Sequence, residues 1–160
     1  TNLLSGNDKN FEISSISNNT FEEREKPIAL TYQSLISNKV TQLGNETYVS
    51  IDYSNDLEGL ITDEKRKNSL EIGQNILREY STEFQIPEGY KVKQLPVNLN
   101  VNTDQYNFQI TYTTEANKII LQKKITLKNH IVDIGNIKNW NQDLKKLKDT
   151  NNEQLILEKI

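Results

Sequence analysis

The chain has 160 residues, of which 34% are hydrophobic and 26% charged, and its formal net charge is -3. This length is typical of a single domain. The lack of a basic excess argues against nucleic acid as a partner, because phosphate binding needs clustered lysine and arginine. No stretch approaches the ~18 apolar residues of a membrane span, so no span is predicted. The sequence has no cysteine, which excludes disulfides, thiolate zinc sites and cysteine nucleophiles.

The sequence begins at Thr1 and not at methionine, and its first residues lack the pattern of a signal peptide. We therefore expect a fragment or trimmed chain whose targeting information lies elsewhere.

Alternating polar and apolar residues predict β-strands along most of the chain, at 11–16, 28–36, 46–53, 77–86, 90–94, 97–101, 105–114, 118–128 and 154–160. Eight or nine strands with polar turns between them indicate an all-β fold, an antiparallel β-sandwich. Residues 54–68 lack a strand period and are expected to form a long loop with one helical turn. We expect one domain over 1–160, with N-terminal strands and a linker-like part at 1–60 and a C-terminal module at 61–160.

The clearest local structure is a long hairpin of 105–114 and 118–128, joined by a short turn at 115–117. Its second strand carries Ile119, Leu121, Ile125 and Leu127 on one face. Lys123 interrupts this face, which predicts a bulge or an edge strand at that point.

The stretch 84-FQIPEGYKVKQLP-96 predicts a corner between two strands. Ile86 to Gly89 suits a tight turn, with proline in the second position and glycine in the last. Alternation resumes at Tyr90, and Pro96 ends the short strand that follows.

One segment, 136–149, has a helical period. Its apolar residues are spaced three, four and three apart, at Ile137, Trp140, Leu144 and Leu147. Asn136 is a candidate N-cap, and three lysines near the end suit the negative pole of the helix dipole. We interpret the segment as a helix that packs on the sandwich, with a basic membrane- or partner-binding helix as the alternative.

No group of residues specifies a reaction, so no catalytic, cofactor-binding or metal residue is expected. The single histidine, His130, lies in a context without a nucleophile elbow. The paired carboxylates are expected in polar loops, without the burial that shifts a pKa for acid–base work. The segment 55–59 only weakly resembles a calcium loop. The paired carboxylates are Glu22 and Glu23, Asp56 and Glu58, and Asp63 and Glu64. Two glycosylation sequons, at Asn18 and Asn45, carry little weight because the chain is rich in asparagine.

The phrase IPEGYKVKQLP at 86–96 resembles the C-terminal β module, DUF3858-like, of large Bacteroidetes transglutaminase-like proteins. The segment 66-RKNSLEIG-73 corresponds to a second family phrase, with Ser69 where the family has proline. The hairpin at 105–128, the helix around Trp140 and the last strand at 155–160 follow the family order. The N-terminal segments 26–33 and 46–53 resemble the link after the catalytic domain.

This resemblance implies a non-catalytic accessory module that packs on or positions the transglutaminase-like domain of the same parent chain. The catalytic Cys-His-Asp group would then lie outside this chain, and the location would be periplasmic, cell-envelope or secreted. An alternative from a different class is a carbohydrate- or peptide-binding sandwich that uses some of the seven tyrosines for stacking. Neither interpretation requires a cofactor.

Overall fold

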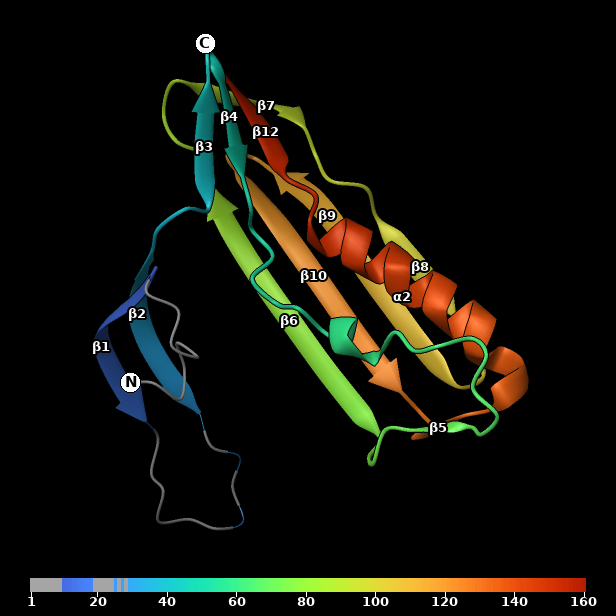
Figure 1. The fold of residues 1–160 in the computed structure, drawn as a ribbon. Coiled ribbons are helices and arrows are strands. Elements are labelled where there is room, and N and C mark those ends of the chain that lie inside the picture. The colour runs from blue at the N-terminus through green and yellow to red at the C-terminus, as the bar shows by residue number, and fades with distance from the viewer. Residues whose placement is uncertain (1–9, 19–24, 26, 28) are drawn as a thin grey trace. The chain divides into compact units, whose positions relative to one another are not determined.

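The computed structural model of the protein describes residues 10–18, 25, 27 and 29–160 (Figure 1). The chain divides into two compact units, Thr1–Thr41 and Gln42–Ile160, which we describe separately. Of the segments predicted above, Glu22, Glu23 and the first residue of the strand at 28–36 lie outside the described residues.

The N-terminal unit contains an antiparallel hairpin of β1 (Phe11–Asn18) and β2 (Leu30–Ile36). The pairing register shifts between Ile13 and Ser15, so a bulge lies at this point of β1. Because side chains alternate along a strand, residues three apart would normally face opposite ways. The bulge instead places Ile13 and Ile16 on the same face of the hairpin. That face also carries Phe11, Leu30, Tyr32 and Ile36.

Two four-stranded sheets make up most of the second unit, and strand β3 of one of them begins at Val40, at the end of the first unit. One has the order β6-β10-β9-β8, with β6 at Ile76–Gln85, β10 at Lys118–Leu127, β9 at Tyr106–Glu115 and β8 at Leu99–Asn102. The other has the order β3-β4-β12-β7, with β3 at Val40–Leu43, β4 at Glu46–Val49, β12 at Leu155–Lys159 and β7 at Tyr90–Gln94. A small pair joins β5 (Leu70–Glu71) to β11 (Ile131–Val132). The expected antiparallel, sandwich-like all-β fold with one C-terminal helix is confirmed.

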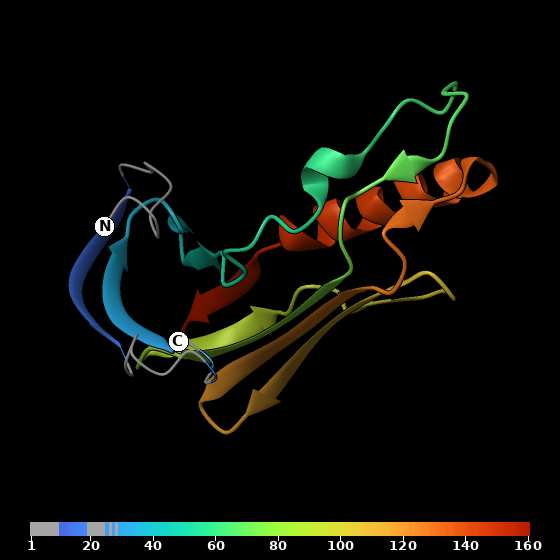
Figure 2. The same cartoon turned by 90° about the horizontal axis from the view of Figure 1, so that it is seen from below.

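The helix α2 (Ile137–Asn151) lies over one face of the sheet β6-β10-β9-β8, as Figure 2 shows. All four residues of the predicted stripe are buried: Ile137, Trp140, Leu144 and Leu147. Asn136 occupies the N-cap position, although its side chain makes no capping hydrogen bond. The helix also continues two residues beyond the predicted end, and the added Thr150 and Asn151 are buried as well.

The two long strands of the predicted hairpin supply much of the core beneath this helix. In β9 the buried residues are Tyr106, Phe108, Ile110 and Tyr112, so burial alternates along the strand as its predicted period of two requires. The connecting turn is shorter than predicted, because Glu115 still pairs with Lys118 and only Ala116 and Asn117 lie between the strands. A 3₁₀ turn, η1 (Glu58–Leu60), forms in the long loop as expected, and a second, η2 (Ile134–Asn136), precedes α2.

The predicted corner at 84–96 connects the two four-stranded sheets, since β6 belongs to one sheet and β7 to the other. Its turn starts one residue later than expected, because the Tyr90 amide donates to the Pro87 carbonyl at 3.2 Å. Gly89 has a φ of 81° and therefore stands in the third position, where a type II turn requires a positive φ. The strand that follows ends at Gln94, as predicted.

Candidate functional site

Lys123 lies in the core of the second unit, on the central part of β10. Its side chain has 0% exposure. The register of β10 with both neighbouring strands is continuous through this position. The predicted bulge or edge at Lys123 is therefore wrong. The lysine follows the ordinary alternation of the strand, and a set of buried partners compensates its charge.

The ammonium group of Lys123 uses all of its protons within the protein. Its Nζ donates to Asp52 Oδ2 at 2.9 Å, to Ser54 Oγ at 2.7 Å and to Asn151 Oδ1 at 2.8 Å. An ammonium has three donors, so this set is complete. Asp56 Oδ2 lies 3.2 Å from the same nitrogen and contributes charge without an aligned hydrogen bond.

Asp56 has its own cation. Arg78 donates from its guanidinium to Asp56 Oδ1 at 2.7 Å, and the Tyr80 hydroxyl donates to the same oxygen at 2.9 Å. Burial by itself would raise the pKa of Asp56, but the hydrogen bonds of Arg78 and Tyr80 and the charge of Lys123 outweigh it, and the pKa lies below its usual value. The expectation that Asp56 sits unburied in a polar loop is wrong, since only 1% of this residue is exposed.

A local turn positions the other carboxylate. The backbone amide of Ser54 donates to Asp52 Oδ1 at 3.0 Å, and the Ser54 hydroxyl donates to the same oxygen at 2.7 Å. This is the short side-chain-to-backbone pattern that aspartate forms in turns. It leaves the second oxygen, Oδ2, directed at Lys123.

We call this group of side chains the lysine cluster. It consists of Lys123, Asp52, Asp56, Arg78, Tyr80, Ser54 and Asn151. It holds two cations against two carboxylates, so its formal charge is balanced. It joins four segments that are separate in the sequence: the loop after β4, the edge strand β6, the central strand β10 and the C-terminal end of α2. Sequence reasoning missed it, although one signal was present, namely a lysine in the apolar series of a strand.

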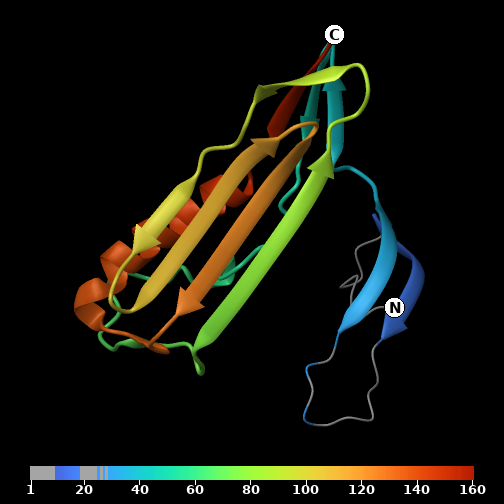
Figure 3. The same ribbon diagram turned by 180° about the vertical axis from the view of Figure 1, so that it is seen from behind.

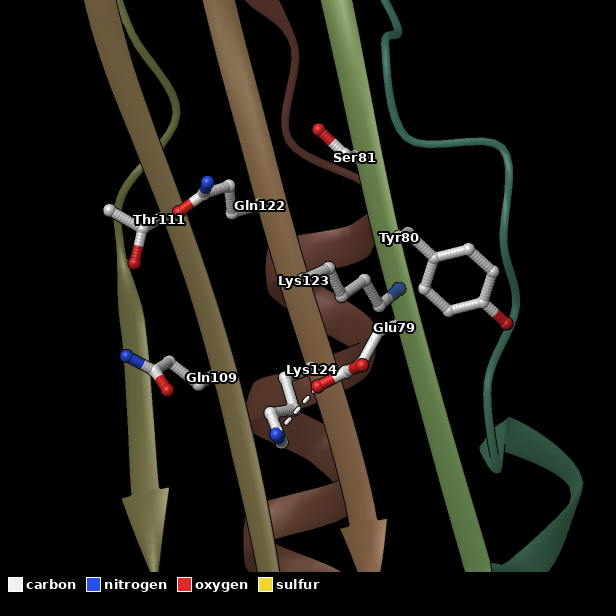
Figure 4. Close-up of a pocket in the computed structure, with 8 residues that line it drawn as sticks. All are labelled: Glu79, Tyr80, Ser81, Gln109, Thr111, Gln122, Lys123 and Lys124. Atoms are coloured by element: carbon white, nitrogen blue, oxygen red, sulfur yellow. Dashed lines mark hydrogen bonds and ion pairs between the residues drawn. The ribbon is translucent and has the colours of Figure 1, made fainter.

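The face of the sheet β6-β10-β9-β8 that lies opposite the lysine cluster is polar, and in the described part of the chain no helix covers it (Figure 3). A shallow concavity of about 270 Å³ lies there across β6, β10 and β9. Figure 4 shows the amides of Gln109 and Gln122 beside Thr111, and the ion pair of Glu79 with Lys124 at 2.6 Å. Tyr80 borders the concavity, but its ring turns away from Thr111 toward Asp56.

The remaining sequence candidates do not come together. His130 is half-buried, and its backbone carbonyl accepts from the Ile72 amide at 2.8 Å. Asp63 and Glu64 are exposed. The Asn45 side chain donates to Glu158 at 3.4 Å. Glu58, the partner of Asp56 in the sequence, accepts from the Asn151 amide at 3.4 Å.

Within the described residues, no three His, Asp or Glu side chains are grouped so as to hold a metal ion, the segment 55–59 included. No helix formed by these residues is long and apolar enough to cross a bilayer.

Comparison with known proteins identifies a family whose profile matches the chain and a solved structure that is similar to it. The profile of a domain of unknown function with solved structure, DUF3858, matches residues 46–157. A crystal structure of a candidate protease from Parabacteroides distasonis is similar with a TM-score of 0.54 and 18% identity over 68% of this chain. The matched part is 22% of that protein, so the chain spans about a fifth of the length of the structure it resembles. Comparison with curated proteins gives no match.

Proposed function

The chain belongs to the DUF3858 family, and from this we propose that it is a non-catalytic accessory module of a larger transglutaminase-like protein of the cell envelope. In this role it packs on or positions the catalytic domain, in the periplasm, at the envelope or outside the cell. The much longer chain of the similar structure supports a modular arrangement of this kind.

The observation that carries the proposal is the apolar face of the β1–β2 hairpin. Ile16 is 58% exposed, Tyr32 42% and Leu30 40%. A two-stranded hairpin is at best marginally stable in water, and clustered exposed apolar side chains mark interaction sites. The register shift after Ile13 places Phe11 and Ile13 on the same face as these side chains.

The hairpin precedes the family match, which begins at Glu46. It therefore stands between the module and any domain that comes before it in a parent chain. We assign its apolar face to contact with the transglutaminase-like domain.

A binding experiment tests this proposal. The coding sequence upstream of this chain should specify a domain with a catalytic Cys-His-Asp group, and that domain, produced separately, should bind the chain. Ile16→Asp and Tyr32→Asp place a charge on the apolar face and should weaken binding strongly. Gln33→Asp lies on the opposite face and serves as the matched control. An upstream region without such a domain, or equal binding by all three variants, would refute the proposal.

A second candidate is a carbohydrate- or peptide-binding module, and the polar concavity of Figure 4 favours it. Side-chain amides and hydroxyls such as those of Gln109, Gln122 and Thr111 can hydrogen-bond to sugar hydroxyls. The expected stacking platform of tyrosines is not present in this concavity, because its one aromatic residue, Tyr80, is engaged with Asp56. A screen of immobilised glycans with the native chain and the double variant Gln109→Ala/Gln122→Ala tests this candidate. Binding that the double variant loses would support it, and no binding would remove it.

A further inference from the structure

Lys123 and Asn151 are placed for a covalent reaction with each other. The Nζ atom of Lys123 lies 2.8 Å from Asn151 Oδ1, and the carbonyl carbon of that amide is one bond further. Lys123 is 2% exposed and Asn151 7%. We propose that these two side chains form an intramolecular isopeptide bond, which ties the C-terminal end of α2 to the central strand β10.

Two features of the site favour this reaction over hydrogen bonding alone. Both groups are held by the fold, which replaces a bimolecular encounter with a fixed geometry. Lys123 and Asn151 are also buried, so the charged pair of ammonium and carboxylate is favoured less over the neutral amine and carboxylic acid than it would be in water. Lys123 Nζ lies 2.9 Å from Asp52 and can transfer a proton to it. This gives a neutral amine, which is the form of lysine that acts as a nucleophile.

The two carboxylates of the cluster have different roles in this scheme. Asp56 stays ionised, because Arg78 and Tyr80 both donate to it. Asp52 faces Lys123 with Oδ2, while its Oδ1 is held by Ser54. Asp52 is therefore the base that accepts a proton from the ammonium.

The atoms and charges balance as follows. Lys123 gives one proton to the Asp52 carboxylate, which becomes a neutral carboxyl group. After the Asn151 amide turns about its Cβ–Cγ bond, the amine attacks the carbonyl carbon Cγ. The bond from Cγ to Nδ2 breaks, a second proton from Nζ passes to the departing nitrogen, and ammonia leaves. The third hydrogen stays on the new secondary amide.

Glu58 contacts the amide nitrogen that leaves as ammonia. Its Oε1 lies 3.4 Å from Asn151 Nδ2 and accepts a hydrogen bond from it. This contact orients the amide nitrogen away from Lys123. The formal charge of the core stays balanced after the reaction. Lys123 and Asp52 are then both neutral, and the ion pair of Asp56 with Arg78 remains.

Intact-mass spectrometry of the folded native chain tests the proposal, after incubation at neutral pH and with folding checked by circular dichroism. The expected mass is lower than the sequence mass by one ammonia. Tryptic digestion should yield one branched peptide that joins the segments around Lys123 and Asn151, with no cleavage after Lys123. A folded native chain that keeps its full sequence mass overturns the proposal.

Three variants separate this reaction from other losses of ammonia. Asn152→Ala changes the exposed neighbouring asparagine and should still form the cross-link. Asp52→Asn removes the base and should slow the reaction. Lys123→Met cannot form the bond. A loss of ammonia that persists in Lys123→Met is succinimide formation at an asparagine, and that result would also overturn the proposal.

Discussion

Trp140 of the helix α2 meets Tyr106 of strand β9 edge to face, with ring centroids 5.0 Å apart and planes at 79°. Phe108 stacks on Tyr106 at 5.0 Å, so three aromatic rings form one contact between helix and sheet. The indole nitrogen of Trp140 donates to the Leu60 carbonyl at 3.1 Å. The only tryptophan of the chain thus connects α2, β9 and the loop of η1 in the core.

Replacing Trp140 with alanine should lower the free energy of unfolding by about 3–5 kcal/mol, because the ring is fully buried and would leave a cavity. Denaturant unfolding measures the loss. Lys145→Ala, on the exposed side of the same helix, is the control and should change little. The fluorescence of the native chain should be blue-shifted and resistant to acrylamide. Red-shifted emission that is freely quenched would contradict this packing.

The lysine cluster predicts a strong contrast between adjacent lysines of one strand. Asp56→Ala removes the buried carboxylate to which Arg78 and Tyr80 both donate and should cost about 3–5 kcal/mol. Lys123→Ala leaves the buried Asp52 carboxylate without its cation and should be similarly costly. Lys124→Ala breaks the ion pair with Glu79, whose side chain is 60% exposed, and should cost about 1 kcal/mol or less. Equal losses in Lys123→Ala and Lys124→Ala would show that the cluster does not stabilise the core.

Part of the fold can be predicted directly from residue spacing, whereas the lysine cluster cannot. The intervals between Ile137, Trp140, Leu144 and Leu147 define a helix face without knowledge of the rest of the chain. The same reasoning treats Lys123 as an interruption, because its partners come from Asp52, Asp56 and Asn151, which are distant in the sequence. A period along one strand contains no information about such long-range partners.

Short elements and register changes were also missed. The strands β3, β5 and β11 have four residues or fewer, too few to show an alternation. The predicted strand at 46–53 ends at Val49, since the turn at Asp52 takes the chain out of the sheet. The register shift after Ile13 was not predictable, because the pairing of β1 with β2 determines it.

The stability of the chain should fall in acid. The pKa of Asp56 in the folded state lies below its usual value of 3.8, so the unfolded state binds the proton more readily. The contribution of Asp56 is therefore fully present above the usual pKa and is lost as the pH falls through the lower, folded value. Urea unfolding at a series of pH values measures this slope. Asp56→Asn should flatten it, and an unchanged slope in that variant would assign the acid sensitivity to other carboxylates.

The isolated chain should have neither transamidating nor proteolytic activity. It lacks the thiolate that such a mechanism requires, and in the part that the structure describes the side chains of Lys123 and Asp52 are only 0% and 5% exposed. Assays with casein and an amine donor measure both reactions. Turnover above the buffer blank that survives purification and is lost in His130→Ala would contradict this expectation.

Amide hydrogen exchange of the β1–β2 hairpin, measured in the chain alone and in its parent protein, tests the accessory role most directly. The hairpin amides should exchange rapidly in the chain alone, because a two-stranded sheet with an open apolar face is at best marginally stable. In the parent protein the same amides should be strongly protected, while those of β9 and β10 should be protected in both. Equal exchange of the hairpin amides in the two samples would contradict the proposal that this face packs on the catalytic domain.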